Sequence, residues 1–339
     1  MKKKKLVVTL ILVGAFVALA SGLVIYYCTL AYGSVEASRS VVVEIPPGTG
    51  ADRVAELLAG AGVTEHPRLF RLYLYLTGRD SLLKAGTYRF EAPACFSDAA
   101  ETLVAGKVLT VRFTLPEGLD AEQMAMRLGR EGVCGAGEFL SAAARAAIER
   151  YGVNSPEGYL FPDTYEVPAG ITAAEVARLL LDRGDRVWEE ELAKSGRTGV
   201  DRYETLTLAS IVQAEGADFE EFPRIAGVFS NRLERGMNLE SCATVLFALG
   251  EHKQVLEYAD LKAESPYNTY LHPGLPPGPI DNPGRAAIAA ALSPERHDYL
   301  FFVSNGDGTH TFSRTLAEHN RARAETEEAR TAALAHDTP

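Results

Sequence analysis

Glu215 continues the apolar stripe of a predicted helix and is the strongest candidate for chemistry. In the run 206–216, Leu208, Ile211 and Val212 have the spacing of one helix face, and Glu215 follows seven residues after Leu208 on that face. Burial on such a stripe would raise the pKa of a carboxyl group, and a general acid near neutral pH needs a raised pKa. A helix end that reaches solvent, or a glutamate paired with a buried arginine, would give the same pattern.

Three further acids, Asp218, Glu220 and Glu221, follow closely on Glu215. They precede a second predicted helix over 224–235, and negative charges are stabilised near the N-terminus of a helix. We therefore interpret them as charges at the start of that helix.

Two loops rich in proline and aromatic residues follow, at 265–270 and 274–284. Tyr267 and Tyr270 offer ring faces, and Asn268 offers an amide, which suit the apolar faces and hydroxyl groups of sugars. Loops of this composition also serve as structural braces. The sequence leaves the two interpretations equal.

Other kinds of active site find little support in the sequence. His310 and His319 are nine residues apart without a nearby cysteine or third histidine, and the chain has no H-E-x-x-H, no glycine-rich phosphate loop and no G-x-S-x-G. We expect neither a metal site nor a cofactor.

The N-terminus has the composition of a membrane anchor. The lysines at 2–5 precede an uncharged run from Leu6 to Cys28, and the next acidic or basic residue is Glu36. Such a run can cross a bilayer, and the lysines before it orient the remainder of the chain outward. A signal peptide cleaved near Ala20 is the alternative, but the apolar run continues past that site. We predict a retained single span.

Charge and cysteine content narrow the functional classes. Four of the 34 basic residues precede the predicted span and all 45 acidic residues follow it, so the exported part is more acidic than the net −11 of the whole chain. Proteins bind nucleic acid largely by neutralising phosphates with Lys and Arg, which disfavours that partner. Cys28, Cys95, Cys134 and Cys242 lack metal-type spacing, and no spacing favours a disulfide among the last three.

The exported part begins with a predicted small α/β module. The expected elements are a strand over 41–45, a helix whose apolar face holds Val54, Leu57 and Leu58, a helix over 68–76, a strand over 86–90 and a helix over 97–105.

Part of this module is repeated. The segment 45–63 aligns without gaps with 115–133, pairing Gly48 with Gly118 and Leu58 with Leu128, which indicates a repeated strand-turn-helix unit. Turn glycines and helical leucines shared by chance would also produce this alignment. Farther along, a long helix is expected over 173–194, and we expect the main domain boundary between Tyr151 and Ser155.

Several short motifs, taken in order, resemble those of the MltG (YceG-like) endolytic murein transglycosylases from end to end of the chain. They are Pro46-Pro47-Gly48-Thr49-Gly50, Lys84-Ala85-Gly86-Thr87-Tyr88, Glu157-Gly158-Tyr159-Leu160-Phe161-Pro162-Asp163-Thr164-Tyr165, Leu208-Ala209-Ser210-Ile211-Val212 with Glu215, and Tyr267-Asn268-Thr269-Tyr270 with Gly274-Leu275-Pro276-Pro277-Gly278.

The resemblance implies an α+β protein of the inner membrane with its catalytic domain on the extracytoplasmic side. The expected parts are a cytoplasmic tail (1–5), a transmembrane helix (6–28), a LysM-like module with the repeated unit (39–153) and a YceG-like transglycosylase domain (154–332). Glycan strands of peptidoglycan are the implied substrate, and synthases of the cell-wall machinery are implied partners.

The resemblance also implies a mechanism in which one glutamate, matching Glu215, is the catalytic acid and base. It would protonate the oxygen between N-acetylmuramic acid and N-acetylglucosamine, and the muramic acid's own 6-hydroxyl would attack, leaving a 1,6-anhydro end. The expected residues of the substrate groove are Glu157, Tyr159, Asp163, Glu240, Tyr267, Asn268 and Tyr270.

The chain departs from the family pattern at two places. Gln213 stands where the family often has an acidic residue, and Glu240-Ser241-Cys242-Ala243 stands where Gln-Thr-Asp-Pro is common. The second departure leaves open a catalytically idle scaffold that binds the cell wall, or compensation by Glu240. A muramidase that uses water is a further alternative, and it would need a second carboxylate such as Glu240 or Asp163.

Overall fold

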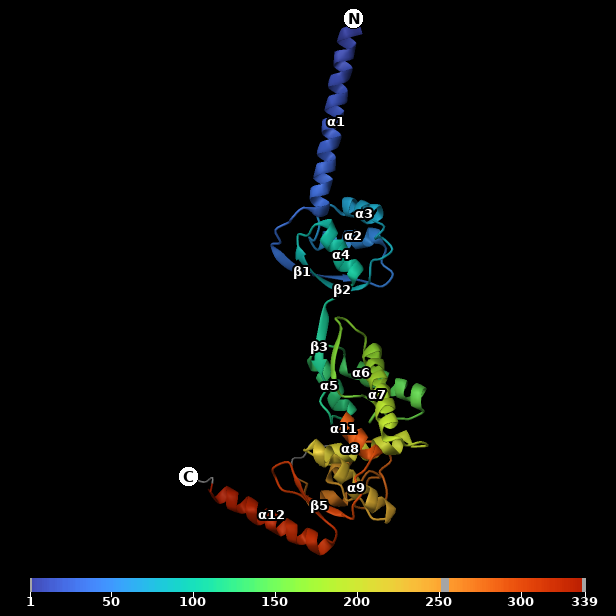
Figure 1. Ribbon diagram of the computed structural model, residues 1–339, viewed down its shortest axis with the longest axis vertical. Coiled ribbons are helices and arrows are strands. Elements are labelled where there is room, and N and C mark those ends of the chain that lie inside the picture. The colour runs from blue at the N-terminus through green and yellow to red at the C-terminus, as the bar shows by residue number, and fades with distance from the viewer. Residues whose placement is uncertain (1, 251–255, 337–339) are drawn as a thin grey trace. The chain divides into compact units, whose positions relative to one another are not determined.

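The computed structural model describes residues 2–250 and 256–336, and side chains over 6–250 and 256–328. Helices and short strands alternate along the chain (Figure 1), so the fold is α+β, as predicted. The contacts divide it into a first unit, Met1–Arg112 with Glu166–Gly170, and a second unit, Phe113–Tyr165 with Ile171–Pro339. The family-based division at 153/154 stays a prediction.

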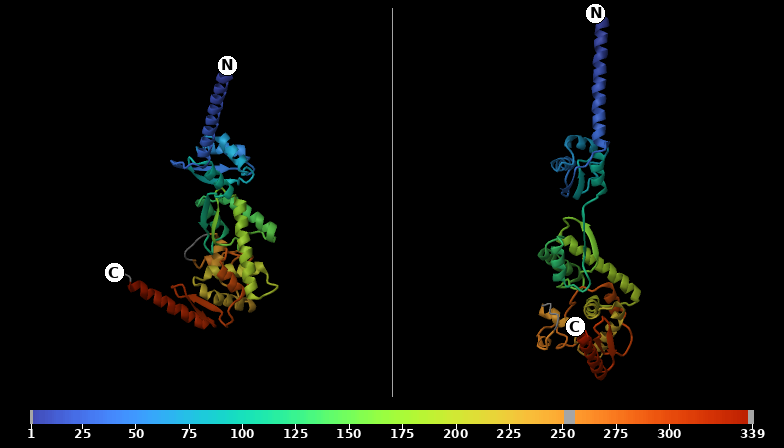
Figure 2. Two further views of the ribbon diagram at one scale, coloured as in Figure 1. Left: turned by 45° about the horizontal axis from the view of Figure 1, so that its top comes forward. Right: turned by 90° about the vertical axis from the view of Figure 1, so that its left-hand side faces the viewer.

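The predicted span forms one long helix, α1 (Lys2–Tyr32). Its stretch Leu6–Tyr32 has a mean hydropathy of 2.6 and is long and apolar enough to cross a membrane. Figure 2 shows α1 as one continuous helix that runs out from the rest of the first unit. Only its last turns join that unit, where Ala31 is fully buried. Met1, the first residue of the predicted tail, lies outside the described residues.

The remaining elements of the first unit match the predicted order of strands and helices. They are β1 (Arg39–Ile45), α2 (Ala51–Gly60), α3 (Pro67–Leu76), β2 (Gly86–Ala92) and α4 (Phe96–Ala105).

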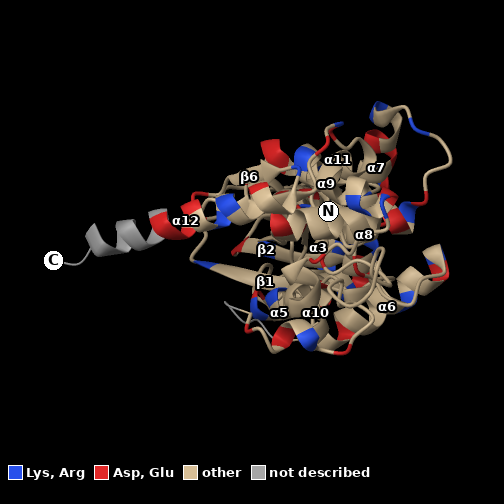
Figure 3. Ribbon diagram, turned by 90° about the horizontal axis from the view of Figure 1, so that it is seen from below, with Lys and Arg blue, Asp and Glu red and all other residues tan. Residues whose placement is uncertain are grey.

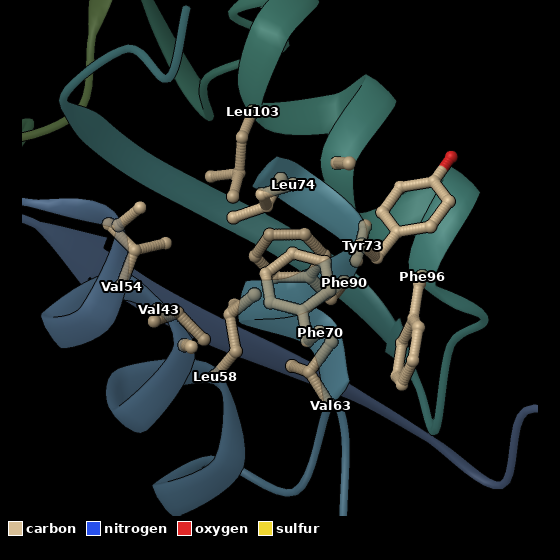
Figure 4. Close-up of a cluster of buried hydrophobic side chains, with 14 of the residues drawn as sticks. Val43, Val54, Leu58, Val63, Phe70, Tyr73, Leu74, Phe90, Phe96 and Leu103 are labelled. Carbon is tan, nitrogen blue, oxygen red and sulfur yellow. The ribbon is translucent and has the colours of Figure 1, made fainter. Parts of the chain in front are cut away.

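The first unit has its own hydrophobic core, shown in Figure 4. The β-branched run in β1 favours a strand, and β1 pairs antiparallel with β2 so that Val43 faces Tyr88. Phe70 of α3 and Phe96 of α4 meet edge to face, with ring centroids 5.6 Å apart. Leu58 of α2 is fully buried against these residues.

The boundary between the units crosses a two-stranded sheet of β3 (Thr110–Thr114) and β4 (Thr164–Pro168). The other elements belong to the second unit. They are α5 (Ala121–Arg130), α6 (Ala136–Tyr151), α7 (Ala173–Ser195), α8 (Arg202–Glu215), η1 (Phe219–Glu221), α9 (Phe222–Glu234), α10 (Cys242–Leu249), η2 (Asp260–Lys262), α11 (Arg285–Leu292), β5 (Phe301–Ser304), β6 (His310–Ser313) and α12 (Leu316–His336).

The second unit is built around α8, whose residues from Thr205 to Val212 are all buried. Helix α11 packs against α8, α7 and α9. Its alanines at 287, 290 and 291 are buried, and their small side chains allow this close approach. Figure 3 shows Lys and Arg interspersed with Asp and Glu along the helices. The packing of α9 and α11 against α8 holds the end of α8 in place.

The two segments aligned in the sequence have the same local structure. Helices α2 and α5 are both ten residues long and start at equivalent positions. Gly48 and Gly118, in the turns before them, have φ values of 76° and 78°, and Gly62 and Gly132, after them, have 76° and 70°. The equivalent leucines, Leu58 and Leu128, are both fully buried.

Candidate active site

Glu215 is the last residue of α8, where the chain leaves the helix. Gly216 adopts an extended conformation there, and its N–H still bonds the carbonyl of Val212 at 3.0 Å. A Cβ on Gly216 would lie 2.5 Å from the ring of Phe222, so a larger residue cannot take this place without a shift. Because α8 ends at Gly216, Glu215 is held in place as the last residue of the helix.

Two donors at the start of α10 hold the carboxyl group of Glu215. The hydroxyl of Ser241 donates to its Oε1 at 2.5 Å, and the backbone N–H of Ala243 is a second donor. Ser241 is the N-cap residue of α10. The carboxyl group therefore lies where unpaired N–H groups and the helix dipole favour negative charge.

The 265–270 loop positions Ser241. The hydroxyl of Thr269 accepts a hydrogen bond from the N–H of Ser241 at 3.0 Å and lies 2.8 Å from the hydroxyl of Thr244, which donates to the carbonyl of Ser241. Asn268, fully buried, donates its amide to the carbonyls of Leu261 and Ala263. The loop thus braces the donor that holds Glu215.

Opposing influences act on the pKa of Glu215. Burial is the largest and raises it, whereas the bonds from Ser241 and Ala243 and the charges of His310 and Arg232 lower it, and the balance stays above the ordinary value. Arg232 is fixed by the carbonyls of Leu300 and Leu239, at 2.6 and 2.9 Å.

This arrangement accommodates both states of the carboxyl group. Burial favours the protonated form, which can give a proton to a leaving group. The two donors and the nearby positive charges stabilise the carboxylate that remains. Glu215 is therefore suited to act first as an acid and then as a base.

A cavity of about 810 Å³ lies next to the end of α8, and Glu215 itself is not among its lining residues. Ala214 and Ala243, the chain neighbour of Glu215 and its backbone donor, are part of the lining. The other sides include the start of α5, the loop before it, the 280–281 loop, and Leu246 and Phe247 of α10. The volume is in the range of pockets that bind small organic ligands.

Of the predicted groove residues, Glu157 lines this cavity. Its carboxyl group accepts hydrogen bonds from the N–H of Ala121, at 2.8 Å, and from the amide of Asn282, at 3.0 Å. Burial raises the pKa of Glu157 to about 8, and the charge of Asp120 adds to the rise. Through these two hydrogen bonds, Glu157 links the first turn of α5 to the 280–284 loop.

Tyr267 and Tyr270 each contact a residue of α10, and neither is among the residues that line the cavity. The ring of Tyr267 packs against Phe247 at 4.9 Å between centroids, and Phe247 lines the cavity. The hydroxyl of Tyr270 lies 3.2 Å from the sulfur of Cys242. Burial raises the pKa of Tyr270, and the neighbouring Cys242 and the charge of Glu215 add to the rise.

The remaining predicted groove residues lie outside the cavity lining. Tyr159 is buried and stacks on Tyr151 at 4.3 Å. Asp163 forms an ion pair with Arg183 at 2.8 Å. Glu240 pairs with Arg232 at 3.2 Å and has a left-handed backbone, with φ 49°.

Both donors to Glu215 lie within the second departure from the family motifs, because Ser241 stands where Thr is common and Ala243 stands where Pro, which has no N–H, is common. Gln213 lines the cavity and accepts a bond from the N–H of Gly284 at 2.9 Å. Cys242 is exposed, and the donors to Glu215 are its neighbours, Ser241 and Ala243. All four cysteines are free thiols.

Within residues 2–250 and 256–336, no group of three or more His, Cys, Asp or Glu side chains could hold a metal ion. The ring of His310 pairs with Glu221 at 2.8 Å, and His319 stacks on Phe301. Of the three acids after Glu215, Asp218 caps the short helix η1, while Glu221 binds this histidine.

Several site residues escaped the sequence analysis: Ser241, Thr269, Arg232, Asp281 and Asn282. Ser241 has the residue type of a helix cap, and a cap signal could have identified it. The other four depend on contacts between distant segments; for example, the side chain of Asn282 reaches Leu119, Glu157 and Leu160.

Comparisons with known proteins agree on one family. The YceG-like family matches residues 43–325. An endolytic murein transglycosylase of Bacillus subtilis (strain 168) is 29% identical, over 85% of both chains. One from Streptococcus pneumoniae serotype 2 is 30% identical over 85% of this chain, which spans 58% of that protein. A crystal structure of a yceG-like protein from Listeria monocytogenes superposes with a TM-score of 0.56 at 32% identity, covering 84% of this chain and 99% of that one.

Proposed function

The chain belongs to the YceG-like family, and we propose that it is an endolytic murein transglycosylase with Glu215 as its catalytic acid and base. The observation that carries the proposal is the carboxyl group of Glu215, which has a raised pKa and two donors that stabilise its ionised form. The relatives named endolytic murein transglycosylase support the substrate and the reaction.

In the first step, protonated Glu215 gives its proton to the glycosidic oxygen between N-acetylmuramic acid and N-acetylglucosamine. The bond from that oxygen to the anomeric carbon breaks through an oxocarbenium-like transition state. Ser241 and the N–H of Ala243 stabilise the carboxylate that forms. Arg232 adds positive charge nearby.

In the second step, the carboxylate of Glu215 takes the proton of the muramic acid's 6-hydroxyl. That oxygen attacks the anomeric carbon of the same sugar and closes a 1,6-anhydro ring. No water is consumed, and Glu215 is again protonated. One carboxyl group therefore suffices, in contrast with the pair that most glycosidases use.

We also propose how the chain reaches its substrate. Helix α1 anchors the protein as a single span with both units on the extracytoplasmic side, because the lysines precede the apolar stretch. The first unit serves as a LysM-like module that contacts the wall. Glycan strands occupy the cavity beside Glu215, with Glu157, Tyr267 and Tyr270 along their path, and peptidoglycan synthases are the proposed partners.

The test uses the full chain in detergent micelles and purified glycan strands. We expect Glu215→Gln to lower the rate of strand cleavage about a thousandfold, because a positioned general acid and base is worth roughly 10²–10⁴. Glu204→Gln is the matched control, since Glu204 is exposed in the first turn of the same helix. Cleavage by Glu215→Gln at the rate of the control would refute the assignment.

A further inference from the structure

Helix α3 of the first unit carries apolar residues on both of its faces. Its inner face packs in the core of the unit, where Phe70 is fully buried. Its outer face exposes Leu72, Tyr75 and Leu76, whose exposed fractions are 44%, 66% and 64%. Residues three and four apart lie side by side on a helix, so these three side chains form one patch. A contiguous apolar patch, unlike a single exposed leucine, marks a surface that meets a partner.

The charge on the outer face of α3 is basic. Arg68 is exposed one turn before Leu72, and α3 contains no Asp or Glu. Arg71, on the flank of the helix, pairs with Asp52 at 3.0 Å, and the exposed Glu65 precedes the helix. Apolar and basic residues on one helix are typical of helices that lie in a membrane interface. The residues of this surface, here called the α3 face, are Arg68, Leu72, Tyr75 and Leu76.

The last turns of α1 fix α3 beside the predicted span. The hydroxyl of Tyr26 lies 2.9 Å from Nε2 of His66, the N-cap residue of α3. Farther along α1, the ring of Tyr32 meets the ring of Tyr73 edge to face, with centroids 5.8 Å apart. Both helices belong to the first unit. Helix α3 therefore lies at the level of the last turns of α1.

Helix geometry indicates where that level lies in a membrane. A helix rises about 1.5 Å per residue, so about 20 residues cross a hydrocarbon core of about 30 Å. With the lysines at 2–5 on one side, the residues from Leu6 to about Ile25 cross the core. Tyr26 then lies at the far boundary of the core, where tyrosine is enriched in membrane proteins. Through its bond to Tyr26, the start of α3 lies at the same boundary.

The α3 face points toward that boundary. In Figure 1, α3 lies at the end of the first unit from which α1 runs out, and the core of the unit lies on its other side. The face of α3 that points away from the core therefore points back along α1. This continuity with the predicted span identifies lipid as the partner of the patch.

We propose that the α3 face lies in the outer interface of the membrane that α1 spans, with Leu72, Tyr75 and Leu76 against the acyl chains. The inference rests on the proposed anchor, because it requires α1 to cross the bilayer. Arg68 then lies among the phosphates of the lipid headgroups, where its positive charge is favoured. A single span leaves the tilt of the first unit against the membrane free, whereas this second contact restricts it.

The test measures contact with lipid in the full chain, reconstituted into vesicles that contain no other protein. Trp188 is the only tryptophan of the sequence and is buried in the second unit, so the native chain supplies the background fluorescence. Tyr75→Trp adds a reporter on the α3 face. Lipids brominated near the headgroup end of their acyl chains should quench about half of the added fluorescence, since an interfacial helix is buried about 5–10 Å into this boundary. Leu72→Trp, one turn earlier, is a second reporter and should respond alike.

Val42→Trp is the matched control in the same unit. Val42 is exposed and alternates along β1 with the buried Val43, so it points to the face of the sheet opposite the core in which α3 packs. Brominated lipids should leave its fluorescence unchanged. Equal quenching of Val42→Trp and Tyr75→Trp would overturn the inference. An absence of quenching in both α3 reporters would also overturn it and leave the patch to a protein partner.

Phe16→Trp separates the inference from the anchor on which it rests. Phe16 lies near the middle of the stretch that crosses the core and is exposed on α1, so lipids brominated near the ends of their acyl chains should quench a tryptophan there. Quenching of Phe16→Trp without quenching of the α3 reporters would overturn the inference alone. Fluorescence of Phe16→Trp that these lipids do not change would count against the proposed anchor, and the inference would fall with it.

Discussion

The two repeated segments, 45–63 and 115–133, share one local structure, but the residues that surround the N-terminus of their helices differ. In the first, the N-cap residue of α2 is Gly50, which has no side chain to cap the helix, and a Cβ on Gly48 would meet open space. In the second, a Cβ on Gly118 would lie 3.5 Å from Gln213 and 3.8 Å from Asp281. Only the second turn borders the cavity that Ala214 and Ala243 line.

The start of α5 carries features that α2 lacks. Asp120 and Gln123 form a reciprocal capping box, and the N–H of Ala121 holds the carboxyl group of Glu157. The shared helix and glycines explain why both segments fold alike. The residues that differ at the helix start explain why only one of them lines the cavity of the candidate site, as expected when function lies in loops carried by a common scaffold.

The largest expected effect comes from the equivalent core leucines. Leu58→Ala and Leu128→Ala should each cost about 2–5 kcal/mol of unfolding free energy, because both side chains are fully buried. Hydrogen exchange should show the loss in the first unit for Leu58→Ala and in the second for Leu128→Ala. Strand cleavage should fall only with Leu128→Ala, and an equal fall with Leu58→Ala would contradict the separation of roles.

The next effect concerns pH at the start of α5. The pKa of Glu157 is about 8 in the folded chain, above the ordinary 4.5, mainly because it is buried. The folded state therefore keeps a proton that the unfolded state loses, and the unfolding free energy should fall by a few kcal/mol as the pH rises from about 4.5 to about 8.

Amide exchange along α5, corrected for intrinsic rates, should reveal this fall, and Glu157→Gln should flatten it. Asp281, whose pKa is also raised, should supply part of what remains. Protection that stays constant between pH 5 and 8 in the native chain would show that Glu157 is ionised when folded.

Substitution of the two turn glycines by alanine should have a smaller effect on stability and should affect cleavage at only one of them. Gly48→Ala and Gly118→Ala should each cost about 1–2 kcal/mol, because both positions have a left-handed backbone. Gly118→Ala should also slow cleavage, since its methyl group points toward Gln213 and Asp281. Rates measured well below the melting temperature would test this, and a similar slowing in Gly48→Ala would count against it.

The smallest effects lie at the helix caps. Asp120→Ala should lower the unfolding free energy by about 1 kcal/mol, through loss of the capping box. Gly50→Asp should raise it by a few tenths of a kcal/mol, because an added side chain at the extended Gly50 meets no neighbour. Thermal unfolding of each unit would measure both changes, and destabilisation by Gly50→Asp would mean that α2 cannot accept this cap.

Local patterns were enough to predict most helices and strands of the first unit, the repeated segments and the position of Glu215. These depend on apolar periodicity and on turn glycines, which act over a few residues. The partners of Glu215 were not predictable in this way, because Ser241 and Arg232 reach it from other segments. A short motif can also mislead. The motif that contains Tyr159 suggested a place in the groove, whereas the ring of Tyr159 is buried in the core.

We propose that Glu215 transfers protons to and from sugar atoms alone, without water as a reactant. The most direct test is mass spectrometry of products after the full chain digests purified glycan strands in water enriched in ¹⁸O. We predict anhydro-ended fragments without the heavy isotope, and no such fragments from Glu215→Gln. Reducing ends that carry ¹⁸O would show that water attacks the anomeric carbon and would identify a hydrolase.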